Sequence, residues 1–217
     1  MKARLTPAAL VAAGLMALVT TATPALELTF ADAPLGVVPK DFEPAQTGPG
    51  EPGRWEVVED SGASGGKAVA QVSQDPTENR FPLLVHTPIV PADVEIRTKV
   101  KPVAGRVDQA GGLAVRLRDP NNYYLVRANA LEGNGRFYKV VGGQRTQLAG
   151  ADVPVAANAW QRLTLRAQSD RFTVSFNGRE LFTATDQTFS TPGRVAFWTK
   201  ADSVTRFDAL DINPLQP

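Results

Sequence analysis

The stretch GGLAVRLRDPNNYYLVRAN, residues 111–129, predicts two β-strands joined by a tight turn. Apolar and polar side chains alternate on both sides of Asp119-Pro120-Asn121-Asn122. A period of two places each set of side chains on its own face of a sheet. Pro presets the φ angle of a turn, and Asp and Asn side chains bond the nearby backbone. We therefore expect a β-hairpin with one apolar face and one polar face.

The polar face of this hairpin is rich in cations, phenol and amide. It carries Arg116, Arg118, Tyr123, Arg127 and Asn129. A hydroxyl-rich ligand is typically held by a flat apolar ring and a few aimed polar groups. With two residues of a later strand, the predicted substrate-binding set is Arg116, Tyr123, Arg127, Asn129, Trp198 and Lys200. Two other interpretations stay open: an ordinary solvated sheet face, and a core position for Trp198.

Strand patterns recur along the rest of the chain at intervals of roughly 8–12 residues, which is typical of a β-sandwich. We expect strands near residues 28–30, 55–58, 68–73, 81–86, 93–100, 137–141, 146–148, 163–167, 172–176, 181–182, 194–200 and 207–212. Residues 34–53 are rich in Pro and Gly and are expected to be an ordered loop. No window after residue 25 keeps a helical period. The sequence predicts one all-β domain of two antiparallel sheets over residues 27–214.

Composition excludes several classes of function. The 217-residue chain has a formal charge of +1 and no Cys. Without Cys there are no disulfides, no thiolate chemistry and no Cys-ligated zinc. Removing residues 1–25 leaves 21 basic and 22 acidic side chains. A near-neutral chain gives no electrostatic reason to expect nucleic acid or an anionic membrane as a partner.

Residues 1–25 have the pattern of a cleaved signal peptide. Lys2 and Arg4 precede an apolar run over residues 8–19, and small residues flank Pro24. Cleavage is expected after Ala25, with Ala22 as a second candidate. The apolar run is too short to span a bilayer comfortably. The sequence therefore predicts a periplasmic or secreted protein with no membrane span after cleavage.

Five segments occur together in a familiar order: GRVDQAGG, DPNNYYLVRANALE, YKVVGGQRTQLA, FNG followed by LF, and FWTKADSVT. In this series the chain resembles the 3-keto-disaccharide hydrolase domain family, over most of residues 30–212. The resemblance implies a bacterial exported protein with a concanavalin A/laminin-G-like jelly-roll fold and a concave face that handles sugars. Some members of that family cleave 3-keto-glycosides with the help of a metal. The chain departs from the family at Phe207-Asp208-Ala209, where an acidic pair often stands.

Candidate catalytic and metal-binding residues are few. Glu132 and Asp202 are candidate oxygen ligands for Ca²⁺, with turn capping around residues 129–139 and a polar hairpin near Asp202 as the alternatives. His86, the one His, has no partner in the sequence to orient it as a general base. No nucleophile elbow, phosphate-binding loop or zinc-protease motif occurs. No catalytic residue is assigned.

The sequence is compatible with three functions. The first is an exported sandwich that binds a carbohydrate or glycoside on a concave sheet face. The second is a metal-assisted glycoside hydrolase or lyase that acts on 3-keto-glycosides. The third is a non-catalytic protein-interaction or structural sandwich whose polar face is only surface.

Overall fold

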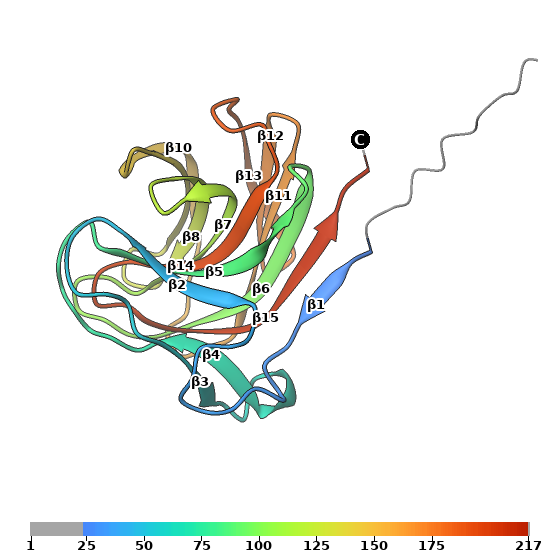
Figure 1. Ribbon diagram of the computed structural model, residues 1–217. Helices are drawn as coiled ribbons and strands as arrows, with labels where there is room; N and C mark the ends of the chain where they lie inside the picture. The colour runs from blue at the N-terminus through green and yellow to red at the C-terminus, as the bar shows by residue number, and fades with distance from the viewer. Residues whose placement is uncertain (1–23, 217) are drawn as a thin grey trace, which may run out of the picture.

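Two antiparallel β-sheets make up most of the computed structural model, which describes residues 24–216 (Figure 1). The predicted signal peptide therefore lies, except for its last two residues, outside the described residues. Within the described part, one 3₁₀ turn at Ser64–Gly66 interrupts an otherwise all-β chain. None of the described helical residues forms a segment long and apolar enough to cross a membrane. The predicted all-β fold class is confirmed.

The larger sheet has eight strands. Its order is β13 (Arg179–Thr185), β12 (Arg171–Phe176), β11 (Gln161–Gln168), β6 (Val94–Ala104), β15 (Val204–Pro214), β4 (Lys67–Gln71) and β3 (Trp55–Glu59), with β1 (Leu26–Leu28) also paired to β15. Along β6, buried side chains alternate with more exposed ones. This is the pattern of a sheet with one face in the core and one face toward solvent.

The smaller sheet has seven strands. Its order is β10 (Gln144–Asp152), β9 (Asn134–Val141), β8 (Asn122–Asn129), β7 (Ala110–Asp119), β14 (Gly193–Thr199), β5 (Phe81–Val90) and β2 (Phe42–Thr47). The hairpin predicted from residues 111–129 is β7–β8, closed where Asp119 pairs with Asn122. From Tyr123 to Asn129, every residue of β8 is buried. A strand buried on both faces needs cover on both sides.

Aromatic rings from the two sheets meet in the core between them. Tyr124 of β8 contacts Phe172 of β12 with ring centroids 4.4 Å apart, and Phe137 of β9 lies 4.9 Å from the same ring. Phe197 of β14 stacks on Phe207 of β15 at 4.5 Å. Burial of such large rings accounts for much of the hydrophobic free energy of folding.

A second apolar layer covers the opposite face of the seven-stranded sheet. It consists of Phe81, Leu83, Val85, Ala110, Ala114, Leu117, Tyr123, Leu125, Tyr138, Val140, Ala196 and Trp198. Trp198 is fully buried there and stacks on Phe81 with centroids 5.3 Å apart. We call this side of the sheet the curled face.

The seven-stranded sheet curls around its second apolar layer. Thr47 of β2 bonds the Tyr123 hydroxyl of β8 at 2.8 Å, although three strands lie between them. Strands are spaced about 4.8 Å apart, so in a flat sheet these two strands would be roughly 19 Å apart. Arg145 of the edge strand β10 likewise lies over Phe81 of β5, at 4.9 Å from the ring centroid. The two sides of the sheet therefore bend toward each other over this face.

Two details of the fold differ from the sequence prediction. Residues 42–47, expected to be loop, form edge strand β2, which tolerates Pro44 because an edge strand needs fewer ladder bonds. The strict alternation predicted through Arg116 and Arg118 is wrong, because a register shift separates Val115 from Asp119. Arg116 adopts a left-handed φ of 50° at this bulge.

Candidate functional site

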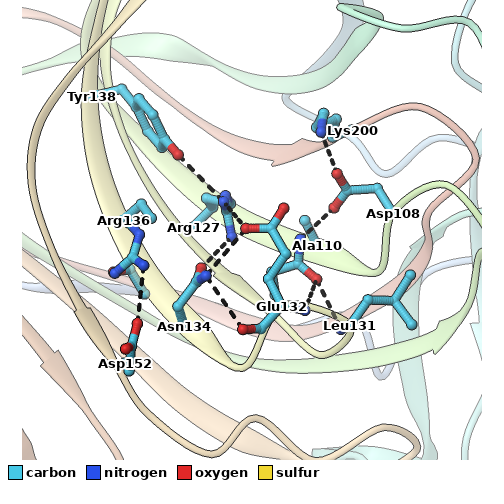
Figure 2. A network of polar contacts seen from close by, with 12 residues as sticks. Asp108, Ala110, Arg127, Leu131, Glu132, Asn134, Arg136, Tyr138, Asp152 and Lys200 are labelled. Carbon is cyan, nitrogen blue, oxygen red and sulfur yellow. Dashed lines mark hydrogen bonds and ion pairs between the residues drawn. The ribbon is translucent and has the colours of Figure 1, made fainter.

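A polar cluster lies on the curled face where β8 and β14 end and β9 begins (Figure 2). We define the polar cluster as Asp108, Arg127, Asn129, Glu132, Asn134, Tyr138 and Lys200. Three parts of the chain supply these residues: the loop before β7, the hairpin of β8 and β9 with its turn, and the end of β14. The strand order β9-β8-β7-β14 brings these segments side by side.

Arg127 is the centre of the cluster and is only 4% exposed. Its Nη1 donates to Asn134 Oδ1 at 2.7 Å, and its Nη2 donates to Glu132 Oε2 at 2.7 Å and to the Tyr138 hydroxyl at 3.3 Å. Its Nε is buried and has no partner in the structure. Burial alone would raise the pKa of Glu132, but the bond to Arg127 and its charge lower it. Glu132 is thus ionised and 42% of its side chain faces solvent.

The second half of the cluster is built around Asp108. This carboxylate accepts from Asn129 Nδ2 at 2.7 Å and from the Lys200 ammonium. Asp108 is 1% exposed, so burial raises its pKa, and the bond and charge of Lys200 only partly offset this effect. The Lys200 side chain is 19% exposed and, with Glu132, forms the solvent side of the cluster.

One side-chain amide and one carboxylate hold the loops around the cluster in place. Asn129 Oδ1 accepts from the amides of Leu131 and Glu132, at 2.9 and 3.2 Å. Asp202 accepts from the amides of residues 106, 107 and 108 at 2.6–3.1 Å, and these bonds outweigh burial and lower its pKa. Asn129 thus caps the turn that presents Glu132, and Asp202 holds the loop that presents Asp108.

Arg145 covers the aromatic layer beside the cluster. Its guanidinium carbon lies 4.4 Å from the centroid of Tyr138, 4.9 Å from Phe81 and 5.9 Å from Trp198. These are cation–π distances. Among the described residues it makes no ion pair, in contrast to Arg127, and its Nη1 is buried without a hydrogen-bond partner. Burial lowers the pKa of Arg145.

A cleft of about 350 Å³ opens next to this guanidinium. We define the Arg145 cleft by its lining residues: Gly48, Pro49, Asn79, Phe81, Gly143, Gln144 and Arg145. Gly48 has a φ of 80°, and a Cβ there would lie 2.0 Å from the carbonyl oxygen of Asn79. The two loops that form one wall therefore pack backbone against backbone.

The structure brings together five of the six predicted substrate-binding residues on the curled face. Arg127, Asn129 and Lys200 belong to the polar cluster. Tyr123 and Trp198 lie in the apolar layer with 0% exposure. Trp198 therefore occupies a core position, which was the alternative interpretation of this residue. Its ring has no exposed face against which a sugar could pack.

Arg116 lies apart from the other five, and its predicted place on their face is wrong. From the bulge in β7 its guanidinium donates to the carbonyls of Ala92 at 3.0 Å, Phe189 at 2.8 Å and Ser169 at 2.7 Å. It also lies 5.1 Å from the ring of Phe172, a residue of the other sheet. Arg116 therefore links three loops through hydrogen bonds to their carbonyls.

The two candidate metal ligands do not meet. Glu132 bonds Arg127 and Asn134, whereas Asp202 is surrounded by backbone amides. Across residues 24–216, no three acidic or His side chains are grouped in a way that would hold a metal ion. His86 is buried against Phe42, at a centroid distance of 5.4 Å, and burial lowers its pKa.

Three residues of the site were missed by sequence reasoning: Asp108, Tyr138 and Arg145. Tyr138 and Arg145 flank the turn at Gly142-Gly143, at positions whose alternation matches the polar face of β8. That alternation was a usable signal. Asp108 lies in a loop, where period-two patterns carry no information.

Comparisons with known proteins show the family to which the chain belongs. A family model described as galactocerebrosidase, C-terminal lectin domain, matches residues 88–215. No curated protein matches the chain significantly. Among solved structures, the carbohydrate binding module CBM66 from Bacillus subtilis is 22% identical, with a TM-score of 0.59 over 72% of this chain and 88% of that chain.

Two further solved structures have the same fold at lower identity. A protein of unknown function with a galectin-like fold from Bacillus subtilis is 12% identical, with a TM-score of 0.56 over 80% of this chain and 89% of that chain. A Bacillus licheniformis β-glucanase is also 12% identical, with a TM-score of 0.52 over 79% and 98%. Likeness at such identity shows the jelly-roll fold alone. Because the family model covers more than half of its length, the chain belongs to the galactocerebrosidase C-terminal lectin domain family.

Proposed function

We propose that the chain is an exported carbohydrate-binding β-sandwich that holds a sugar on the curled face of its seven-stranded sheet. The observation that carries this proposal is the Arg145 cleft, in which a guanidinium lies among polar and small apolar residues next to Tyr138 of the polar cluster. Its volume of about 350 Å³ lies at the lower end of the range for small-ligand pockets, roughly 300–1,000 Å³. The lectin-domain family and a carbohydrate-binding module of the same fold support it.

The groups at this face suit a hydroxyl-rich ligand. Glu132 and Lys200 reach solvent at the cluster and offer an acceptor and a donor for sugar hydroxyls. Pro49 and Gln144 line the cleft and offer an apolar surface and an amide. Because Arg127 and Asp108 are already held by neighbours, the exposed groups are fixed in place before a ligand arrives.

Titration calorimetry with a panel of mono- and oligosaccharides tests this function. We expect at least one sugar to bind to the intact protein, and Glu132→Gln to weaken that binding by about 1–3 kcal/mol, because a charged acceptor is lost. Glu180→Gln is the matched control, since Glu180 is exposed on β13 of the other sheet. Silence across the panel, with and without Ca²⁺, would instead favour a protein-interaction or structural sandwich.

A glycoside hydrolase or lyase is the second candidate function. One observation favours it: the pKa of Asp108 is raised by burial, whereas the pKa of nearby Glu132 is lowered by Arg127. Carboxyl groups with pKa values pushed apart are the arrangement used by acid–base pairs. The sequence resemblance to 3-keto-disaccharide hydrolases names the substrate to try. Turnover of a 3-keto-glucoside that Glu132→Gln abolishes would establish this activity, and unchanged substrate after long incubation would count against it.

A further inference from the structure

We propose that the Arg145 cleft receives the acidic substituent of a sugar, so that the ligands of this site are acidic saccharides, carrying a carboxylate or a sulfate. This inference rests on the proposed carbohydrate-binding function and specifies its ligand class. It follows from three features of the curled face: an unneutralised cation, unused hydrogen-bond donors, and space beside both.

The cations of this face outnumber its carboxylates. Three of the four cations have acidic partners within the described chain: Arg127 with Glu132 at 2.7 Å, Arg136 with Asp152 at 2.9 Å, and Lys200 with Asp108. The fourth cation, Arg145, lies over three aromatic rings and has no ion-pair partner within residues 24–216. A partly buried guanidinium without a counter-charge is costly unless a ligand supplies one.

Unused donors accompany this charge. Arg145 Nη1 and Arg127 Nε are both buried and lack acceptors, and both guanidinium groups lie over the ring of Tyr138, at 4.4 and 5.9 Å from its centroid. Two like charges near one ring repel each other, and an anion near both would relieve this repulsion. A planar guanidinium matches the paired oxygens of a carboxylate or sulfate, with two parallel N–H donors.

The shape of the cleft favours an acid attached to a sugar over a free anion. Arg145 shares the cleft with the exposed ring of Pro49 and with Gly48 and Gly143, so an apolar surface for a sugar ring lies beside the anion-binding group. Asn79 and Gln144 add side-chain amides, and these bond hydroxyls. A small inorganic anion would use only the guanidinium and leave the remaining lining without a partner.

The test compares galacturonic acid oligosaccharides, sulfated galactose oligosaccharides and neutral galactose oligosaccharides by calorimetry on the wild-type protein. We expect at least one acidic series to bind about tenfold more tightly than the neutral series, and this preference to shrink as salt is raised. The two acidic series distinguish a carboxylate from a sulfate. Equal affinity for acidic and neutral series would overturn the inference while leaving the proposed function intact. No binding by any of the three series would overturn the inference, and the proposed function would then be decided by the wider saccharide panel.

Two variants locate the preference. Arg145→Gln is expected to lower the affinity for the acidic series about tenfold relative to the neutral series, so that the preference for acid is lost. Arg136→Gln removes a cation of the same face that Asp152 already neutralises, so it should leave the preference unchanged. If Arg136→Gln erases the preference and Arg145→Gln does not, the assignment to Arg145 is wrong. Should Arg145→Gln fail to fold, Arg145→Lys and the wild-type comparison decide the question.

Discussion

Two buried arginines of one hairpin perform different tasks. Arg116 of β7 spends its donors on the carbonyls of Ala92, Phe189 and Ser169, which belong to three separate loops. Arg127 of β8 bonds side chains on the curled face and leaves its Nε unused. A guanidinium satisfied by backbone carbonyls is structural, whereas one with unused donors near a cleft is available to a ligand.

Arg116→Met tests the structural role. The substitution leaves three loop carbonyls without their donor, so we expect the free energy of unfolding to fall by about 3 kcal/mol or more. Urea denaturation measures this loss. Arg118→Met is the control, because Arg118 is exposed on the same strand and should change stability by less than about 0.5 kcal/mol. A drop in sugar affinity with unchanged stability would show that Arg116 belongs to the binding site after all.

Asp60 makes the stability of the protein sensitive to acid. Burial alone would raise its pKa, but bonds from Lys101, from Arg206 at 2.7 Å and from the Gly62 amide at 3.1 Å lower it from 3.8 to about 2. A carboxyl with a folded-state pKa below its unfolded value stabilises the fold above the unfolded pKa. That stabilisation is lost as pH falls from 3.8 to about 2.

We therefore expect Asp60→Asn to unfold more easily than wild type at about pH 7, by about 2 kcal/mol. The gap should close as pH falls toward about 2, because wild type then loses the charge too. Urea unfolding across that range measures it. Asp152→Asn should show no such gap, since its side chain is 86% exposed. A gap that stays constant with pH would mean that Asp60 acts through its shape and not its charge.

At the scale of elements, the curl of the seven-stranded sheet creates the site. It places β2 and β5 opposite β8 and β10, so that side chains far apart in a flat sheet make contact. The hairpin β7–β8 follows from its own alternation and turn residues. The curl does not, because it depends on how the strands bend around the rings of Tyr123, Phe81 and Trp198. Sequence periodicity thus predicted the strands and the polar cluster residues on β8, but not the cleft.

The hydrogen bond between Thr47 and Tyr123 links the two sides of the curl. Both side chains are fully buried, so Tyr123→Phe should destabilise the protein by about 1 kcal/mol, and Thr47→Val by about 2 kcal/mol because the Thr47 hydroxyl also donates to the Pro120 carbonyl. In a double-mutant cycle we expect a coupling energy of about 0.5–1.5 kcal/mol, since removing either hydroxyl breaks the same bond. Denaturant unfolding of the four proteins gives this value. Strict additivity would show that the sheet keeps its curl by packing alone.

At the scale of the whole molecule, the residue pattern within single segments predicts the inner strands of the sandwich. It does not predict the edge strand β2 or the bulge in β7. Strands near residues 55–58 and 172–176 were predictable because each buries one set of alternate side chains. Edge strand β2 was hidden by Pro44 and by the Pro and Gly residues around it. The bulge at Arg116 was hidden because Arg rarely takes a positive φ. Edges and bulges depend on tertiary contacts that no local window contains.

Where the mature chain begins is a prediction, and the position of strand β1 states what each cleavage site would leave. Strand β1 begins at Leu26 and pairs with β15 through Leu26 and Ile212. Cleavage after Ala25 would keep every one of these pairs, as would cleavage after Ala22. We therefore expect the chain expressed in a bacterium to be recovered outside the cytoplasm and to begin at Leu26 or Thr23, as measured by intact mass. A full-length mass in the membrane fraction would contradict this and favour an anchor.

Truncation separates processing from folding. A chain that begins at Leu26 should unfold at the same urea concentration as the exported protein, because it keeps β1. A chain that begins at Thr29 loses the pairing with β15, which includes Leu28 with Leu210, and should be less stable by about 1–2 kcal/mol. If the two truncated chains unfold together, β1 adds nothing to the sandwich and the domain starts later than residue 27. If both are unfolded, the domain begins before Leu26 and the predicted boundary at residue 27 is wrong.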